Sequence, residues 1–513
     1  MGRTRISRLA IVAAGLALVA SSAFAGSSAA RTTATGGGTL VIGRTADVNT
    51  LDPQKATAFQ SVQTLGLIYG TLVQLDSNLN IVPGLATSWK FTDNSQTLTF
   101  NLRPKVKFQN GASFTSGDVA DSLNRILNPA TAAVARSNIA DIQSITTPGP
   151  LTVVLHLADP DVPILAALAD LNTAIMSSAD IQSGSYATHP NGTGPFSFSS
   201  WTPNQTLKLV RNPTYWAGKA PLAGVQFRVI PDETSVVSAL RANQIQMGLI
   251  SDPLVARQVS GGGLKVLRQP SLSYHVLMLN DRHAPLDKQY VRLAIQCAID
   301  RKQVLESAAL GEGQVTGPIT SPAYRSDPNQ RPCPQPNLVK AKKFLAAAGY
   351  PNGGITLTTI VETGEYATAV AEAQSVQAQL AKIGITLNLQ TLDSGTYVSR
   401  WLAADFDAAI ALNGGRVDPD TMYTRYFTST GNLNKVAGYA SPKLDALFAQ
   451  GRATSNVTQR HAIYTQISKT LEGQGVWVWM FTANDYYAIS SKVQNFVPMA
   501  NESLQYLRQT TLG

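Results

Sequence analysis

Apolar residues recur along this chain in short runs and at helical spacing, and the clearest example lies near its midpoint. Residues 274–280 (YHVLMLN) form a short, mostly apolar run that is typical of a buried strand. Val291, Ala294, Ile295 and Ala298 then recur at the spacing of one helical face. The pattern therefore predicts a strand followed by an amphipathic helix.

Two aspartates mark the expected helix starts after this strand. Asp287 follows Pro285 and can accept hydrogen bonds from the free N–H groups of a first turn. Asp300 repeats the signal, with Gln303 three residues later. Gly311 is a suitable C-terminal stop for the second helix.

The same reasoning predicts strands alternating with helices along most of the chain. Expected strands are 39–43, 89–103 as a hairpin, 106–108, 151–157, 207–211, 225–230, 355–361, 385–392, 408–412 and 475–481. Expected helices are 59–69, 119–127, 161–171, 177–182, 234–242, 338–348, 366–383, 397–403, 442–449 and 459–472. The order indicates an α/β fold of two lobes, with a β-rich insert around residues 80–190.

The N-terminal region has the three parts of a secretory signal peptide. Arg3, Arg5 and Arg8 precede an apolar stretch, residues 9–20, that is short for a membrane span. Ala23-Phe24-Ala25 fits a small-x-small cleavage site. We therefore expect residues 1–25 to be removed after Ala25 and residues 26–38 to form a flexible linker; an uncleaved anchor is the alternative. Because the first cysteine is Cys297, we expect no lipid-modified N-terminus and a periplasmic location.

Charge and cysteine content narrow the classes of function. The formal net charge is +9, but lysine and arginine are scattered without a dense run, which disfavours nucleic-acid binding. The chain has two cysteines, Cys297 and Cys333, and an exported protein favours a disulfide between them. Two unpaired core cysteines are the alternative.

No motif predicts catalysis. The five histidines contain no i, i+4 pair, and HExxH, GxSxG, CxxC and Walker lysine motifs are absent from the sequence. Asp418 and Asp420 could hold a cation or act on a sugar, although such pairs more often form turns or contact ligands. A secreted hydrolase acting on peptides or sugars therefore remains an alternative.

Asp47 and Asn49 lie in a polar loop after the first strand, where open α/β sheets place ligands, and a plain solvated loop explains them equally well.

Seven segments together resemble a known family, the extracytoplasmic solute-binding proteins of family 5, which serve dipeptide, oligopeptide and nickel ABC importers. They follow the family order over about residues 39–510, and the most specific is the first. The segments are 102–125 (LRPKVKFQNGASFTSGDVADSLNR), 192–196 (GTGPF), 211–216 (RNPTYW), 291–301 (VRLAIQCAIDR), 341–350 (AKKFLAAAGY), 379–385 (QLAKIGI) and 438–447 (GYASPKLDAL).

The resemblance implies a periplasmic-binding-protein-like fold of two lobes joined by two hinge strands. Lobe I would hold residues 39–80, 190–275 and 485–513, with residues 81–189 as its inserted subdomain, and lobe II would hold 276–484. Residues 274–280 would then be one hinge crossing. The implied protein is a binding protein and not an enzyme: a monomer without cofactor or metal that captures a small molecule or oligopeptide and delivers it to an inner-membrane ABC permease.

The resemblance also indicates which loops bind the ligand. Dipeptide binders of the family hold the peptide amine with an aspartate that aligns with Gly415, and the carboxylate with an arginine that aligns with Gly364. Both anchors are missing, so we expect an oligopeptide held by its backbone, or another polar or cationic solute, and a nickel chelate is a further alternative. The predicted ligand contacts are Asp47, Asn49, Tyr366, Asn413, Arg416, Asp418 and Asp420, with Trp401 and Trp479 as aromatic walls.

Overall fold

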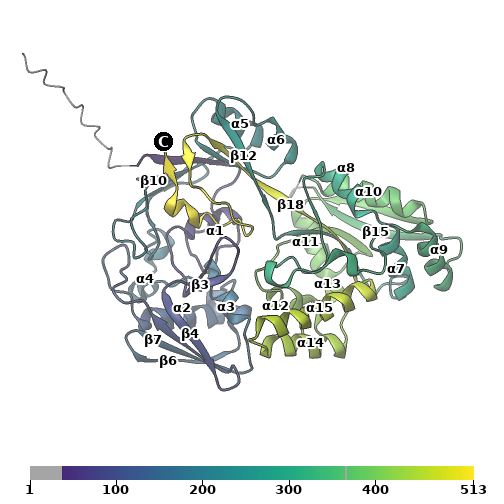
Figure 1. Cartoon of the computed structure of the whole chain (residues 1–513), viewed down its shortest axis with the longest axis horizontal. Coiled ribbons are helices and arrows are strands. Elements are labelled where there is room, and N and C mark those ends of the chain that lie inside the picture. Colours follow the sequence, from purple (N-terminus) through teal and green to yellow (C-terminus); the bar gives the residue numbers. More distant parts are fainter. Residues whose placement is uncertain (1–36, 364–366, 432) are drawn as a thin grey trace, which may run out of the picture. The chain divides into compact units, whose positions relative to one another are not determined.

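One long strand, β18 (Trp477–Ser490), belongs to both halves of the main sheet (Figure 1). Its first part pairs with β13 (Tyr274–Leu279), and its second part pairs with β12 (Leu264–Pro270), in both cases antiparallel. The sequence predicted a strand that ends at residue 481. The strand continues because its polar residues Asn484 and Asp485 still find partners in β12.

The computed structural model describes residues 37–363, 367–431 and 433–513. The predicted signal peptide, most of the linker and Tyr366 lie outside the described residues. No helix of the described ranges is long and apolar enough to cross a membrane.

The main sheet has the strand order β16-β15-β17-β13-β18-β11-β1-β10-β9-β8, and β12 and β14 also pair with β18. The strands on one side of β18 and their helices form the first half. They are β1 (Thr39–Arg44), α1 (Phe59–Leu65), β8 (Phe196–Thr202), β9 (Thr206–Arg211), β10 (Gly224–Val229), α5 (Glu233–Arg241), β11 (Met247–Ile250), α6 (Pro253–Gln258) and β12.

The chain between α1 and β8 forms a separate four-stranded antiparallel sheet in the order β4-β5-β7-β6, with α2 packed on it. This is the β-rich insert that the sequence indicated. Its elements are β2 (Val73–Leu75), β3 (Ile81–Pro83), β4 (Ala86–Thr92), β5 (Thr97–Leu102), α2 (Ser116–Leu127), β6 (Ile142–Gly149), β7 (Thr152–Leu157), α3 (Ile164–Ala167) and α4 (Ser178–Ser183).

The second half begins at β13 and ends in β18. Its elements are α7 (Gln289–Ala298), α8 (Arg301–Ala309), β14 (Gly313–Val315), α9 (Leu338–Ala347), β15 (Ile355–Glu362), α10 (Ala369–Ala381), β16 (Ile385–Leu392), α11 (Ser394–Ala403), β17 (Ala408–Asn413), α12 (Asp420–Phe427), α13 (Asn434–Ala437), α14 (Pro442–Ala453) and α15 (Val457–Gln474). Two short strands, β19 (Val493–Gln494) and β20 (Thr511–Leu512), follow β18 and pair with each other.

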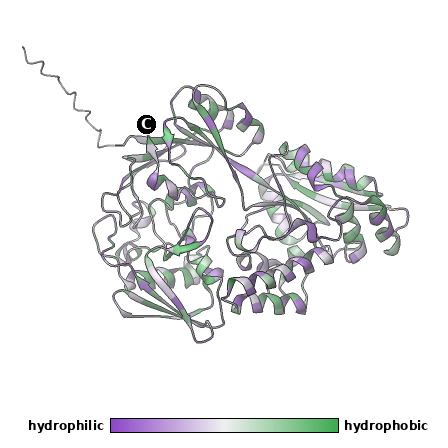
Figure 2. Ribbon diagram, viewed as in Figure 1, coloured by the Kyte–Doolittle hydropathy of each residue, from purple (hydrophilic) through white to green (hydrophobic). Residues whose placement is uncertain are grey.

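Helices cover both faces of the second-half sheet, which explains the continuous apolar runs of its strands. In β13, Leu277 and Leu279 pack with α7, α8, α9 and α10, whereas Val276 and Met278 pack with α11, α12, α14 and α15. A strand that is buried on both faces shows a continuous apolar run, because neither of its faces requires polar residues. Figure 2 shows green and purple residues along the surrounding helices, as expected for helices that bury one face.

The expectation that residues 274–280 form a hinge crossing is wrong. All six residues of β13 are buried, and the strand is hydrogen-bonded to β17 on one side and β18 on the other. The chain instead passes between the halves at residues 271–273, beside residues 483–485 of β18, and the Ser271 N–H donates to the Ala483 carbonyl at 3.0 Å. We call these two short segments the crossing.

The two predicted helix caps differ in outcome. Asp300 accepts a hydrogen bond from the Gln303 N–H at 3.1 Å, so it caps α8 as predicted. Asp287 does not cap α7, because that helix begins at Gln289 after Lys288.

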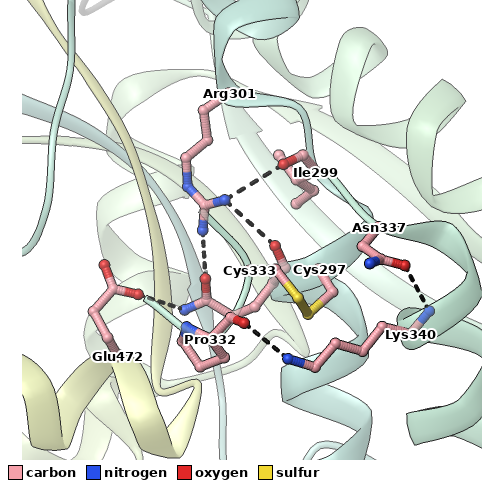
Figure 3. Close-up of a disulfide and its surroundings, with 9 residues drawn as sticks. Cys297, Ile299, Arg301, Pro332, Cys333, Asn337, Lys340 and Glu472 are labelled. Atoms are coloured by element: carbon pink, nitrogen blue, oxygen red, sulfur yellow. Dashed lines mark hydrogen bonds between the residues drawn. A yellow bond between two sulfur atoms is a disulfide. The ribbon is translucent and has the colours of Figure 1, made fainter. Parts of the chain in front are cut away.

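A disulfide joins Cys297 in α7 to Cys333, with the two Cα atoms 5.1 Å apart (Figure 3). The loop after Cys333 is fixed to the same helix, because the Asn337 N–H donates to the Cys297 carbonyl at 2.7 Å. The Asn337 side chain in turn caps α9 by accepting from the Lys340 N–H at 2.8 Å. The disulfide therefore ties α7 to the loop that leads into α9.

We expect the Cys297→Ser/Cys333→Ser double variant to lose about 2–4 kcal/mol of unfolding free energy. The two cysteines are 36 positions apart, and a cross-link over such a loop reduces the entropy of the unfolded chain. Urea unfolding measures the loss. Reductant should lower the stability of the wild-type protein towards that of the variant and leave the variant unchanged; equal stability of both proteins without reductant would contradict the prediction.

Candidate functional site

A cavity of about 300 Å³ lies at the crossing and is lined by residues of both halves. Arg44, Glu233 and Leu249 come from the first half, and His275, Glu312 and Leu412 come from the second. The crossing supplies Ser271, Ser273 and Asp485, and Glu502 reaches the cavity from the chain after β18. Its titratable groups are Arg44, Glu233, His275, Glu312, Asp485, Tyr486, Tyr487 and Glu502.

Two carboxylates of the cavity have partners within the protein. Glu312 lies 3.1 Å from Arg268 and 3.7 Å from Arg257. Glu233 accepts hydrogen bonds from the N–H and hydroxyl of Ser251, each at 2.8 Å. Both groups are therefore compensated without a ligand.

The two basic side chains of the cavity, Arg44 and His275, also have partners. Arg44 lies 3.3 Å from Asp47, donates to Thr64 at 2.8 Å and stacks over the ring of Phe227. Burial lowers the pKa of Arg44 to about 10. His275 lies with its Nδ1 2.8 Å from Glu372. Arg44 forms no ion pair with Asp485 or Glu502 among the described residues.

Asp485 and Glu502 differ from Glu312 and Arg44, because no described residue of opposite charge forms an ion pair with either. Asp485 bonds with Ser271, but its Oδ2 atom is shielded from solvent and has no hydrogen-bond partner. Burial, and then the charge of Glu502, raise the pKa of Asp485 well above its ordinary value. Burial raises the pKa of Glu502 to about 7. The cavity thus holds two acids whose negative charges the described residues leave unbalanced.

The predicted contacts of the first loop are engaged with the protein itself. Asp47 pairs with Arg44 and accepts from the Trp201 indole N–H at 2.9 Å and the Asn204 N–H at 2.7 Å. Asn49 bonds with the side chain of Thr57, in the loop before α1, and with the hydroxyl of Ser61, in α1 itself. Both side chains shape the loop between β1 and α1, and neither lines the cavity.

The predicted contacts of the second loop, residues 413–420, lie close together but also outside the cavity lining. Asn413 ends β17, with its side-chain amide 3.4 Å from the Tyr274 hydroxyl. Arg416 is half exposed and lies 3.4 Å from Asp170 of the insert. Asp418 is buried and forms a two-pronged ion pair with Arg460.

Asp420 belongs to a charged cluster where α14 meets the insert. Arg452 of α14 contacts Asp141 and lies 3.4 Å from Asp161 and 3.7 Å from Asp420. Burial raises the pKa of Asp420 to about 8 and that of Asp161 to about 6. Because the cluster contains one arginine for three carboxylates, burial holds part of its acid in the neutral form.

The two predicted aromatic walls pack against the protein. Trp479 is fully buried and touches Phe427 and Trp477 in the core between the sheet and α12. Trp401 is partly buried, with its indole N–H 3.2 Å from the Met278 sulfur. Both side chains support the second half.

The sequence reasoning missed Asp485 and Glu502. A signal existed for Asp485, since Asn484-Asp485 interrupts an otherwise apolar strand and places a carboxylate in a buried sheet. Glu502 had no such signal, because it follows β18 in a stretch without regular apolar spacing. Among the described residues no group of three or more His, Cys, Asp or Glu is arranged to hold a metal ion.

We expect Arg460→Met to destabilise the protein by about 3 kcal/mol or more, because it leaves the carboxylate of Asp418 buried without its partner. Arg400→Met is the matched control, since its partner Asp405 is largely exposed and such pairs contribute roughly 1 kcal/mol or less. Urea unfolding of both variants provides the measurement. An equal, small effect of both substitutions would contradict the structural role of Asp418.

We expect Glu502→Gln to stabilise the protein at pH 8 but not at pH 4.5. The pKa of Glu502 is about 7 in the folded protein against an ordinary 4.5, so the folded state binds the proton more tightly. Stability is therefore lost as pH rises through this window, and glutamine should restore roughly 2–3 kcal/mol at pH 8. Urea midpoints at both pH values test this, with the exposed Glu306→Gln as control. A gain at pH 4.5 as large as that at pH 8 would refute the titration.

Comparisons with known proteins agree with this architecture. Residues 80–434 match the family described as bacterial extracellular solute-binding proteins, family 5 Middle. A probable di/tripeptide-binding protein of Pseudomonas aeruginosa is 28% identical over 473 residues, covering 84% of this chain and 87% of the relative.

Two solved structures show the same fold across nearly their whole length. AgaA of A. tumefaciens R10, in complex with agropinic acid, has a TM-score of 0.78 and 27% identity, covering 93% of this chain and 99% of its own. DppA of Helicobacter pylori, in complex with the peptide STSA, has a TM-score of 0.77 and 26% identity, covering 93% and 98%.

These matches confirm the two-lobe fold expected from the sequence and leave the hydrolase alternative without support. The family consists of binding proteins of transporters, not enzymes. The chain belongs to the family 5 bacterial extracellular solute-binding proteins and is the solute-binding component of an ABC importer.

Proposed function

We propose that the protein captures a small polar or peptide-like solute in the cavity at the crossing and delivers it to an inner-membrane permease. The observation that carries this is the lining of the cavity by Leu249 and Glu233 of one half and by His275 and Leu412 of the other. A ligand biases the relative position of two lobes only if it contacts both. A volume of about 300 Å³ suits a small solute.

The finer organisation belongs to the same proposal. The sequence placed the lobe boundaries at residues 275 and 485, and the crossing moves them slightly, so that residues 39–80, 190–270 and 486–513 form lobe I, residues 81–189 its insert and residues 274–482 lobe II. Export with cleavage after Ala25, without a lipid anchor, would release a monomeric periplasmic protein. The signal-like arginines, apolar stretch and small residues of the first 25 positions support this reading.

Steric crowding at Gly415 argues against a dipeptide specialist. A Cβ atom added there would lie 2.0 Å from the Leu272 carbonyl oxygen, so this backbone leaves no room for an aspartate that would hold a peptide amine. Arg416 and the other predicted contacts of residues 413–420 stay predictions for a ligand that bridges the lobes. The relatives accommodate a di/tripeptide, the peptide STSA or agropinic acid, which supports a polar solute as the class.

We expect residues 26–513 to be stabilised by one solute class in a thermal-shift screen of peptides, sugars, agropinic acid and nickel–histidine. A ligand at 100 times its Kd adds about 2.7 kcal/mol to the folded state. Isothermal titration then gives the affinity of the hit.

Ser273→Phe, which fills the cavity, should abolish the binding, and Ser260→Phe on an exposed loop should retain it. Stabilisation by none of the classes would overturn the proposed function. Full binding by a folded Ser273→Phe variant would move the site away from the cavity.

A further inference from the structure

The cavity at the crossing contains a pair of acids that the protein does not neutralise. Asp485 lies on β18 opposite Gln269 of β12, and Glu502 lies on the chain that returns to the crossing. That return is fixed by the Leu272 N–H, which donates to the Ala500 carbonyl at 3.0 Å. Both carboxyl groups are therefore held at the cavity wall by regular hydrogen bonding of the backbone.

Apart from the tyrosines, the other titratable side chains of the cavity have partners among the described residues, and Glu233 accepts hydrogen bonds from Ser251. Arg44 pairs with Asp47, His275 contacts Glu372, and Glu312 pairs with Arg268. Among the described residues, the uncharged Ser271 bonds with Asp485, and the Oδ2 atom of Asp485 is left without a partner away from solvent. Two partly buried carboxylates that share a cavity without a counter-charge are less costly when a positive charge enters the cavity.

We propose that the cavity is a recognition site for an organic cation, a solute whose ammonium or guanidinium group binds against Asp485 and Glu502. This rests on the proposed function, because it names the solute class of the same cavity. The cation would pair with the carboxyl groups of Asp485 and Glu502, which both line the cavity. Such charge-assisted bonds are the strong ones in a site shielded from water.

The lining favours an organic cation over a metal ion. Two carboxylates are fewer oxygen ligands than calcium requires, and the aromatic rings of Phe59, Tyr486 and Tyr487 also line the cavity. Aromatic faces attract ammonium and guanidinium groups. The raised pKa values of Asp485 and Glu502 agree with this, since a bound cation would restore their ionised forms and release protons.

The test compares cationic probes with neutral probes of nearly the same shape. Isothermal titration of residues 26–513 with Nα-acetyl-L-arginine against Nα-acetyl-L-citrulline, and with N-acetyl-Ala-Lys-Ala against N-acetyl-Ala-norleucine-Ala, measures the preference, because the second member of each pair has no ammonium or guanidinium group. We expect the cationic member of at least one pair to bind about tenfold more tightly or better. Titration at pH 7 in phosphate and in Tris should show proton release on binding, which a merely structural role of the acids would not produce.

The Asp485→Asn/Glu502→Gln variant should fold, as judged by circular dichroism, and lose both the preference and the proton release. The control variant Glu306→Gln, which changes an exposed carboxylate distant in sequence from both acids, should keep the preference and the proton release. Equal binding of the neutral probes, or a preference that survives in the double variant, would overturn the inference. The inference would also be overturned if CaCl₂ alone stabilised the wild-type protein and did not stabilise the double variant.

The outcome separates this inference from the proposed function. If only sugars, agropinic acid or N-acetylated neutral peptides bind in the cavity, the cationic inference fails and the transport function stands. If no solute of any class binds, both fail.

Discussion

The hydrogen bonding of β18 to strands in both halves is the constraint on which the rest of the structure depends. Its fourteen residues pair with β13 and β14 at one end and with β11 and β12 at the other. Burial along most of the strand leaves few places for a charged side chain, and its partly exposed residues, 483–485, are at the crossing. The cavity and its two acids therefore lie where the sheet passes from one lobe to the other.

Much of the fold could be predicted from the sequence, because burial on both faces of the second sheet produces long apolar runs such as those of β13 and β17. The site could not. Arg44, His275, Asp485 and Glu502 come from four distant segments, and no local pattern records that the chain brings them together. Trp479 shows the same limit, since a sequence does not distinguish an aromatic residue of a binding wall from one of a core.

The acids of residues 413–420 and of the cavity show two different environments for a carboxyl group. Asp418 is matched by Arg460, and this pair holds the loop before α12 against α15. Asp485 and Glu502 have no such match, so their environment favours the neutral form. The acids of residues 413–420 could be selected from their spacing along the sequence. Asp485 and Glu502 are distinguished by the absence of a described counter-charge.

The close approach of Gly415 to the Leu272 carbonyl has an evolutionary consequence. Replacing this glycine by aspartate, a change of one residue, would collide with the backbone of the crossing before the new carboxylate could reach a ligand. The chain path here and an amine-binding side chain at this position exclude each other. A lineage moving between the two would have to shift the crossing first, so the two kinds of specificity are separated by a change of backbone and not by a single substitution.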